Sequence, residues 1–442
     1  MSDKLLCGFG QRDMTPPMGH PVSGYFEPRY ASGVIDPLYT RAILFDNGEK
    51  KSLIIALDVC WINAKNCSDV RDRIAKELNM DADAILINGS HTHTGPDTDP
   101  VCEYQQYLKD QLVGAALDAA ANMAPARMFY GETEAEGISF IRRFLLNDGT
   151  VKTNPAKQVP MIERPLGTPD ETLRLLKIVR EGADDLYMFN FNTHVDTVGG
   201  DEICSDWPGF ACTILEAAIP GSKAMFVLGP QGDVNHTNFL CKEPHYGCDK
   251  YDRVRTEKAA HARFMARVIA GKVLTICDKA AEVSGSDISF GSQKVDLMVN
   301  RPEVTEEQLK EAKALLDAYD AWYANPGDAP RPYTIKSVLG ARRIFNLQSA
   351  PDFESYHVYG MKIGDFVIAT LPGEPFTGLG RQIFAGAGYE KMMVFCNTNG
   401  YCGYIPTKDC FDDGGYESNS NRYKSDSPDR LVNGALAVVK EL

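Results

Sequence analysis

The sequence lacks the long apolar runs that would mark a membrane protein or a secreted precursor. No stretch of its 442 residues approaches the roughly 20 apolar residues of a membrane-spanning helix. The first residues, Met-Ser-Asp-Lys-Leu-Leu, contain no apolar core of signal-peptide length. We therefore expect a cytoplasmic protein with no membrane span.

Positive charge is also scarce. The 46 Lys and Arg residues are outnumbered by 60 Asp and Glu residues, which gives a formal net charge of -14. No basic run or cluster of Lys and Arg with aromatic residues offsets this balance. Because such a chain repels phosphate backbones, we do not expect nucleic acid as a partner.

The 12 cysteines are scattered, and none forms a Cys-x-x-Cys pair, which argues against a structural zinc knuckle or a thioredoxin-like site. Without a leader, we expect them to be reduced thiols. The sequence also lacks a Gly-x-Ser-x-Gly elbow, a His-Glu-x-x-His helix, a Walker loop and a Gly-x-Gly-x-x-Gly loop. A catalytic site must be sought outside these motifs.

What the sequence does contain is strand-like segments interleaved with helical ones. Short runs rich in Val, Ile and Leu, bounded by Gly, Pro or Asp, are typical of buried strands, and the 3.6-residue spacing between them indicates amphipathic helices. The strands are predicted at 52–58, 84–88, 224–228 and 366–371, and the helices at 64–79, 103–123, 208–218, 250–275 and 304–324, the last with Thr305 and Gln308 as a capping box.

Period-two alternation indicates additional antiparallel or mixed pairing, at 126–133, 138–146, 285–299 and 355–371. The stretches 144–168 and 325–333 are interpreted as surface loops, because strand patterning resumes after each. We predict an α/β fold with mixed β-sheets flanked by helices, in a single domain spanning residues 1–442.

The segment with the strongest chemical signal follows the predicted strand 84–88 and reads Gly-Ser-His91-Thr-His93-Thr-Gly-Pro. The carboxyl ends of strands are where α/β proteins place ligands. The His-x-His spacing puts both imidazoles on one side of an extended segment. The pair either faces a site or lies in a surface turn, and the strand and glycines around it favour a site.

Four further apolar strands end in polar, glycine-containing loops. They lead to His194, to Gly229-Pro-Gln-Gly-Asp-Val-Asn235, to Glu374 and to Tyr404. Each also has a structural alternative: a core histidine, a simple turn, a solvated carboxylate and a packing tyrosine. If the five strand ends share one edge, their imidazole and carboxylate groups suit catalytic zinc.

Taken in order, these motifs resemble the catalytic domain of the neutral (non-lysosomal) ceramidases, a zinc amidase family. The matching segments are Asp13-Met-Thr-Pro-Pro17, Gly89 to Pro96, Thr193-His194, Gly232-Asp-Val234, Pro372-Gly-Glu374 and Gly403-Tyr404, which together cover nearly the whole chain. The resemblance implies that zinc is held by His91, His194, Glu374 and Tyr404. It also implies that His93 faces the substrate and that Tyr416 donates a hydrogen bond to a developing oxyanion.

The chain departs from this family in two places. The family usually has Gly-Asp-Val-Ser, with the serine proposed to contact or attack the amide, whereas this chain has Asn235. An asparagine amide is no nucleophile, although it could bind the substrate, so the mechanism we expect is attack by zinc-bound water. The chain also ends soon after the tyrosine region, without the immunoglobulin-like domain of full-length ceramidases. We therefore expect a smaller, soluble amide, ester or lactone. Arg142 and Arg143 either bind an anionic group of it or form a solvated strand edge.

The leading prediction is a zinc-dependent hydrolase of an amide or ester bond in a small, soluble substrate. One alternative is a true ceramidase, an N-acylsphingosine amidohydrolase, which an apolar groove beside the metal would favour. The other alternative is a non-catalytic homologue that binds a metal or ligand, with Asn235 as the trace of the lost activity.

Overall fold

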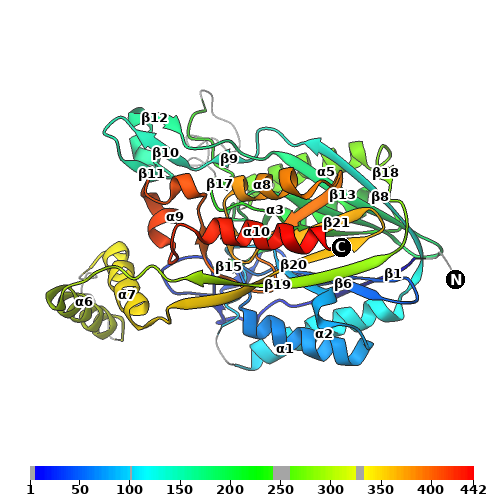
Figure 1. Cartoon of the computed structure of the whole chain (residues 1–442), viewed down its shortest axis with the longest axis horizontal. Helices are drawn as coiled ribbons and strands as arrows, with labels where there is room; N and C mark the ends of the chain where they lie inside the picture. The colour runs from blue at the N-terminus through cyan, green and yellow to red at the C-terminus, as the bar shows by residue number, and fades with distance from the viewer. Residues whose placement is uncertain (1–4, 100–101, 242–258, 325–332) are drawn as a thin grey trace.

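Two β-sheets pack face to face, and helices cover the outer face of each (Figure 1). The computed structural model describes residues 5–99, 102–241, 259–324 and 333–442. The predicted α/β fold with mixed sheets and flanking helices is confirmed.

The larger sheet has nine strands. Its order is β16 (Ser222–Leu228), β14 (Asp185–Phe191), β13 (Thr172–Arg180), β8 (Ala124–Glu134), β1 (Leu6–Asp13), β5 (Tyr39–Asp46), β6 (Lys51–Leu57) and β7 (Ile85–Gly89), with β18 (Ala281–Glu282) paired to β8. The pairs β14–β16 and β6–β7 at the two ends of this order are parallel, and the pairs between them are antiparallel. The carboxyl ends of the two edge strands, β16 and β7, are therefore available for one site.

The smaller sheet has the order β19 (Ile288–Met298), β20 (Phe353–Ile363), β21 (Phe366–Thr370) and β23 (Lys391–Phe395). A three-stranded sheet consists of β11 (Val151–Thr153), β10 (Arg143–Leu146) and β12 (Ile162–Pro165). The loop interpretation of 144–168 was therefore wrong in part. Short two-stranded pairs complete the set: β2 (Pro21–Val22) with β3 (Arg29–Tyr30), β4 (Gly33–Val34) with β15 (Glu202–Ile203), β9 (Phe140–Ile141) with β17 (Val234–Asn235), and β22 (Glu374–Pro375) with β24 (Tyr404–Ile405).

The continuous apolar runs have a simple cause, because the strands are buried on both faces. In β6, Ile54 points into the core between the two sheets, while Ile55 points into the core under the helices. In β21, Ile368 points into the core between the two sheets, and Val367 points into the core under the helices that cover the smaller sheet.

Three helix pairs cover the sheets. The helices α1 (Ala64–Leu78) and α2 (Glu103–Ala121) cover one half of the larger sheet, α3 (Asp206–Ala218) and α5 (Ala260–Ile276) cover the other half, and α8 (Thr377–Ala387) and α10 (Ser427–Lys440) cover the smaller sheet. The first part of the predicted helix 250–275 lies outside the described residues.

Between β19 and β20 the chain forms α6 (Glu306–Ala324) and α7 (Ile335–Ser349), which project from the sheets (Figure 1). The predicted capping box is confirmed, because Thr305 and Gln308 exchange two side-chain to backbone hydrogen bonds. The remaining short helices are η1 (Ala82–Ala84), η2 (Ala156–Met161), η3 (Lys408–Cys410) and α9 (Gly415–Ser420).

The buried side chain of Asn88 in β7 brings distant strand ends together. Its Oδ1 accepts a hydrogen bond from the Leu228 amide at the end of β16, at 2.9 Å. Its Nδ2 donates to the Cys396 carbonyl just after β23, at 2.7 Å. The two edges of the larger sheet and one strand end of the smaller sheet therefore meet beside the segment that carries His91.

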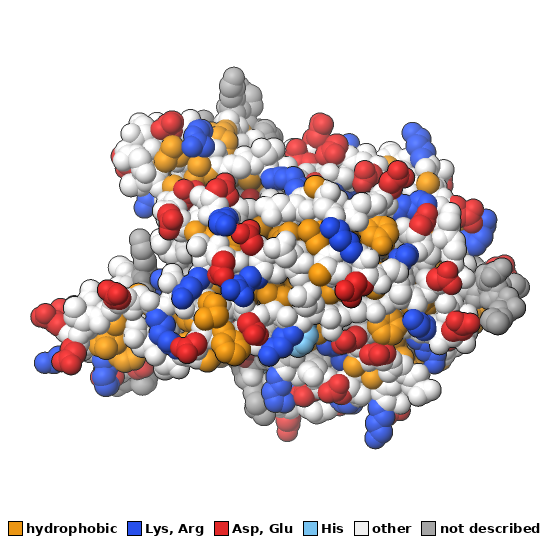
Figure 2. All heavy atoms as spheres, in the orientation of Figure 1, with side chains coloured by type: hydrophobic (Ala, Val, Ile, Leu, Met, Phe, Trp, Pro, Cys, Tyr) orange, Lys and Arg blue, Asp and Glu red, His pale blue; other side chains and the backbone are white. Residues whose placement is uncertain are grey.

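Positive and negative side chains are interspersed over the face seen in Figure 2. Among the described residues, no helix is long and apolar enough to cross a membrane. Ten cysteines are free thiols, as expected. The expectation was wrong for Cys241, which is disulfide-bonded.

Candidate metal centre

His91 lies two residues after β7 and is buried, with 1% of its surface exposed. Its backbone has a φ of 72°, a left-handed conformation that is strained for a residue with a side chain. The ring is fixed by a hydrogen bond from Nδ1 to the Cys60 carbonyl, at 2.8 Å. A carbonyl only accepts, so Nδ1 carries a proton, and in the neutral imidazole Nε2 is the nitrogen whose lone pair faces the site.

His194 has the same arrangement three residues after β14. It is equally buried, and its Nδ1 donates to the carbonyl of Gln231 at 3.1 Å. Gln231 lies in the loop after β16, which pairs in parallel with β14. The parallel pairing therefore places the carbonyl that orients His194, and Nε2 again keeps the lone pair.

Glu374 reaches the two histidines from the segment that follows β21 of the smaller sheet. It forms β22, which pairs in parallel with β24, so that Glu374 lies opposite Tyr404. The Glu374 Oε2 atom lies 3.2 Å from His91 Nε2 and 3.3 Å from His194 Nε2. The ligand atoms of these three buried residues all lie within 4.8 Å of one another.

The chemistry of this set fits a divalent cation. The Nε2 atoms of two imidazoles and a carboxylate oxygen face one point, and in their unprotonated forms all three are electron-pair donors, an arrangement that a metal ion stabilises. Burial alone would lower the pKa of His91, yet Glu374 and Cys60 raise it well above its ordinary value. Burial alone would raise the pKa of Glu374, yet His91 and His194 hold it well below. The site thus favours positive charge beside Glu374.

Tyr404, the fourth predicted ligand, lies next to His194 and opposite Glu374. Its hydroxyl is 3.5 Å from His194 Nε2, and its ring is nearly parallel to the His194 ring at 6.5 Å between centroids. Burial and the charge of Glu374 raise the pKa of Tyr404 well above its ordinary value. Its role as a ligand stays a prediction.

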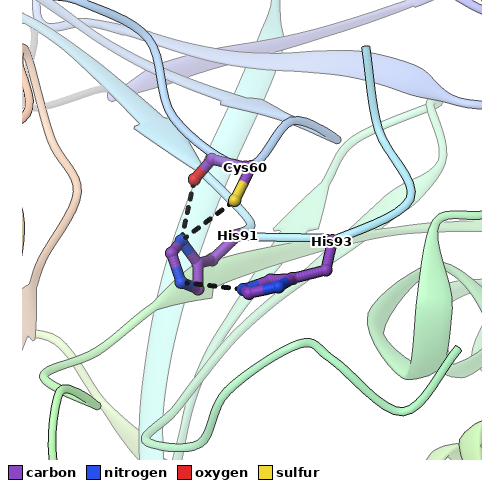
Figure 3. A group of neighbouring side chains, drawn as sticks. All are labelled: Cys60, His91 and His93. Carbon is purple, nitrogen blue, oxygen red and sulfur yellow. Dashed lines mark hydrogen bonds between the residues drawn. The ribbon is translucent and has the colours of Figure 1, made fainter. Parts of the chain in front are cut away.

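His93 lies beside His91, as the His-x-His spacing predicts (Figure 3). The two Nε2 atoms are 3.3 Å apart, and His93 Nδ1 is 3.6 Å from Asp196 Oδ1. Burial and the charge of His91 lower the pKa of His93 well below its ordinary value. Its ring is therefore neutral and can exchange a hydrogen bond with a substrate. Cys60, the third residue in Figure 3, has its Sγ atom 3.8 Å from His91 Nδ1.

Arg142 lies next to the centre and is buried, which rules out a solvated strand edge. Its Nε donates to Glu417 Oε1 at 2.6 Å, and its Nη2 donates to the Gly232 carbonyl at 2.9 Å. Its Nη1 lies 2.9 Å from His194 Nε2. The guanidinium therefore brings a fixed positive charge to the imidazole that faces Glu374.

Arg143 points the other way along β10 and is fully buried. It contacts Glu417 at 3.6 Å and donates to the Gly414 carbonyl at 3.1 Å. Two adjacent arginines thus share one buried carboxylate, and of the two it is Arg142 that lies within hydrogen-bond distance of His194.

Asn235 and Tyr416 occupy different positions relative to the centre. The Asn235 amide donates to Asn154 Oδ1 at 2.8 Å and accepts from the Thr237 amide at 2.9 Å, so both ends of its side chain are engaged within the neighbouring loops. Tyr416 in α9 packs edge-on against Tyr404, with ring centroids 5.3 Å apart, and is 38% exposed. It is thus placed between the centre and solvent.

Sequence reasoning missed several residues that support the centre. Tyr401 donates to Glu374 Oε1 at 2.6 Å, and Glu417 orients Arg142. The side-chain Nε2 of Gln231 lies 3.4 Å from Glu374 Oε2, and the backbone carbonyl of Gln231 orients His194. Gln231 and Tyr401 lie within strand-end loops that the sequence does mark. Nothing in the sequence marks Glu417, because its partner Arg142 is 275 positions away.

The fold is that of solved neutral ceramidases, as the motifs predicted. The structure of neutral ceramidase from Pseudomonas aeruginosa matches 99% of this chain and 75% of its own, with a TM-score of 0.72 and 17% sequence identity. A ceramidase complexed with C2 matches 99% of this chain and 76% of its own, with a TM-score of 0.71 and 17% identity. No protein-family profile and no curated sequence matches the chain.

Proposed function

We propose that this chain is a zinc-dependent hydrolase of an amide or ester bond, with zinc held by His91, His194, Glu374 and Tyr404. One observation carries the proposal: both histidines direct Nε2 at the same oxygen of Glu374, at 3.2 and 3.3 Å, while each Nδ1 is committed to a carbonyl. Histidine ligands whose second nitrogen donates to a backbone carbonyl are characteristic of zinc sites.

When bound, zinc can bring the pKa of a water ligand towards neutrality and so supply a nucleophile for hydrolysis. Asn235 supplies no competing nucleophile, because an amide does not attack a carbonyl and both ends of this one are engaged. The role left for Asn235 is to shape the loop that faces the substrate.

Arg142 is the residue best placed to stabilise negative charge on the substrate. The single lone pair of His194 Nε2 can serve either Arg142 Nη1 or a metal ion. With a metal bound there, Arg142 Nη1 would be free to donate to a substrate oxygen. The bond to Glu417 holds the guanidinium in place during this exchange. Fixed donors of this kind act where charge develops in the transition state.

His93 and Tyr416 complete the proposed substrate contacts. The neutral imidazole of His93 can donate or accept a hydrogen bond at the reacting group. Burial and Glu374 raise the pKa of Tyr416 to about 12, so its phenol keeps its proton and can donate to an oxyanion. Neither role requires either residue to change its charge at neutral pH.

A small, soluble amide or ester remains the proposed substrate, and ceramide is the second candidate. Both solved structures described above are ceramidases. Exposed aromatic side chains also lie near the centre: Tyr25 packs against His93, and Phe26, which is 51% exposed, packs against Tyr416. These rings favour a substrate with an apolar part.

The test begins with elemental analysis of untagged protein after dialysis against metal-free buffer. Near-stoichiometric zinc is expected, with hydrolysis lost on chelation and restored by zinc. Small amides, esters, lactones and ceramides of short and long acyl chain are then compared by kcat/KM. Zinc binding with no turnover across this panel would favour a non-catalytic binding protein. Failure to take up zinc would refute the proposed function.

A further inference from the structure

The two oxygens of Glu374 have different partners. Oε2 faces His91 and His194, whereas Oε1 accepts a hydrogen bond from the Tyr401 hydroxyl at 2.6 Å. A carboxylate has no proton to give, so the phenol is the donor. The bond leaves Oε2 as the oxygen directed at the metal centre.

Tyr401 is itself held by an aromatic neighbour. Its ring stacks on Trp61, with the centroids 5.1 Å apart and the planes 21° from parallel. Trp61 is anchored in turn, because its carbonyl accepts a hydrogen bond from the Thr98 hydroxyl at 3.0 Å. The stack therefore limits where the phenol can move.

The segment Cys60-Trp61, just after β6, thus acts on two candidate ligands at once. The Cys60 carbonyl orients the ring of His91, and the Trp61 ring supports the tyrosine that orients Glu374. Asn397 fixes the segment by donating to the same Cys60 carbonyl at 2.9 Å. One dipeptide therefore sets the relative position of two ligands from different sheets.

We propose that Tyr401, supported by Trp61, is a positioning residue that fixes the metal-facing oxygen of Glu374 and slows release of the metal. This inference rests on the proposed metal site. Without the bond to Oε1, the Glu374 carboxylate can rotate, and its preferred orientation no longer matches the two imidazoles. Loss of such an outer hydrogen bond typically costs about 10- to 100-fold in metal affinity.

The test compares Tyr401→Phe, which removes only the hydroxyl, with Trp61→Leu, which removes the stack. Tyr389→Phe is the matched control, because its hydroxyl bonds Val439 in α10 at 3.2 Å and serves α10 instead of Glu374. Each protein is loaded with zinc, and its release to a chromophoric chelator is followed. The absorption spectrum of the cobalt-loaded forms reports the ligand geometry, which a general loss of stability does not change.

Zinc release is expected to be about 10- to 100-fold faster in Tyr401→Phe, with an altered cobalt spectrum, and unchanged in the control. Trp61→Leu should release zinc faster than wild type, and Trp61→Phe should restore slow release because it keeps a flat ring. Since Trp61 acts through Tyr401, adding Trp61→Leu to Tyr401→Phe should have little further effect.

Two results would overturn the inference in distinguishable ways. Wild-type protein that takes up no zinc or cobalt would refute the proposed function and this inference with it. Wild-type protein that holds zinc, together with a Tyr401→Phe variant that has the wild-type release rate and cobalt spectrum, would refute the role of Tyr401 alone.

Discussion

Replacing Glu417 by alanine is expected to destabilise the protein strongly, because this carboxylate is the counter-charge of two buried arginines. It is fully buried, lies 2.6 Å from Arg142 Nε and 3.6 Å from Arg143 Nε, and accepts a further bond from Thr153 at 2.6 Å. Removing one partner of a buried ion pair leaves an uncompensated charge, which costs about 3–5 kcal/mol.

Glu417→Gln removes the negative charge but keeps nearly the same side-chain shape. The amide leaves the arginines without their counter-charge, as alanine does, but it can still accept from Arg142 or Thr153, so the expected cost is about 2 kcal/mol lower than for Glu417→Ala, the size of a hydrogen bond to a charged group. The exposed pair Arg301–Asp352 has nearly the same separation, 2.7 Å, with side chains 38% and 76% exposed. Because solvent screens this pair, Asp352→Asn should cost less than about 1 kcal/mol and serves as the control.

The free energy of unfolding would be measured by urea denaturation for all four proteins, with the zinc content held equal. The expected order of destabilisation is Glu417→Ala, then Glu417→Gln, then Asp352→Asn. A Glu417→Ala variant no less stable than Asp352→Asn would refute the reasoning, because burial would then have no effect on the strength of the pair.

Three further predictions concern the metal, the loop over His93 and a buried acid. His194→Ala should abolish zinc retention and hydrolysis together, as measured by elemental analysis and turnover, because it removes an imidazole that fixes the metal. Gly24→Ala should destabilise the protein more than Gly48→Ala in thermal unfolding. Both have positive φ, but a Cβ on Gly24 would lie 2.8 Å from His93, whereas one on Gly48 meets nothing within 4 Å. Burial raises the pKa of Asp58 from 3.8 to about 6, so the folded protein holds this proton more tightly than the unfolded chain. Its contribution to stability is therefore lost as pH rises from about 4 to 6, by about 3 kcal/mol in total, and Asp58→Asn should gain this amount relative to wild type between pH 4 and 7.

Each of these three predictions has a distinct contrary outcome. Full zinc retention in His194→Ala would remove it from the ligand set. Equal melting temperatures for the two glycine variants would mean that the approach of Gly24 to His93 is not tight. A constant stability difference between Asp58→Asn and wild type across pH would show that Asp58 titrates alike in the folded and unfolded chain.

Local patterns predicted the strands well, because strands buried on both faces need continuous apolar runs. The strand predicted at 84–88 corresponds to β7 (Ile85–Gly89), and the helix predicted at 64–79 corresponds to α1 (Ala64–Leu78). The predicted segment 138–146 contains β9 and β10, but β11 and β12, the partners of β10, were missed, since these short strands include exposed residues and a proline, and their pairing depends on neighbours across the sheet.

The candidate site was predicted from strand ends and from the family resemblance, and the structure brings His91, His194 and Glu374 together. What the sequence could not reveal is the set of contacts that orients them. Tyr401 and Arg142 act through side-chain bonds whose direction depends on packing between the sheets. A residue such as Glu417 gains its importance from complete burial, which sequence does not encode locally.

The bridge formed by Asn88 has a consequence for how the protein folds. It joins β7, β16 and β23, strands from the first, middle and last parts of the chain, beside candidate ligands spread from His91 to Glu374. Contacts this distant in sequence require large loops to close before they stabilise anything, so they form late. We therefore expect folding intermediates to lack the metal centre. Tight zinc binding should report that nearly the whole chain has reached its native arrangement.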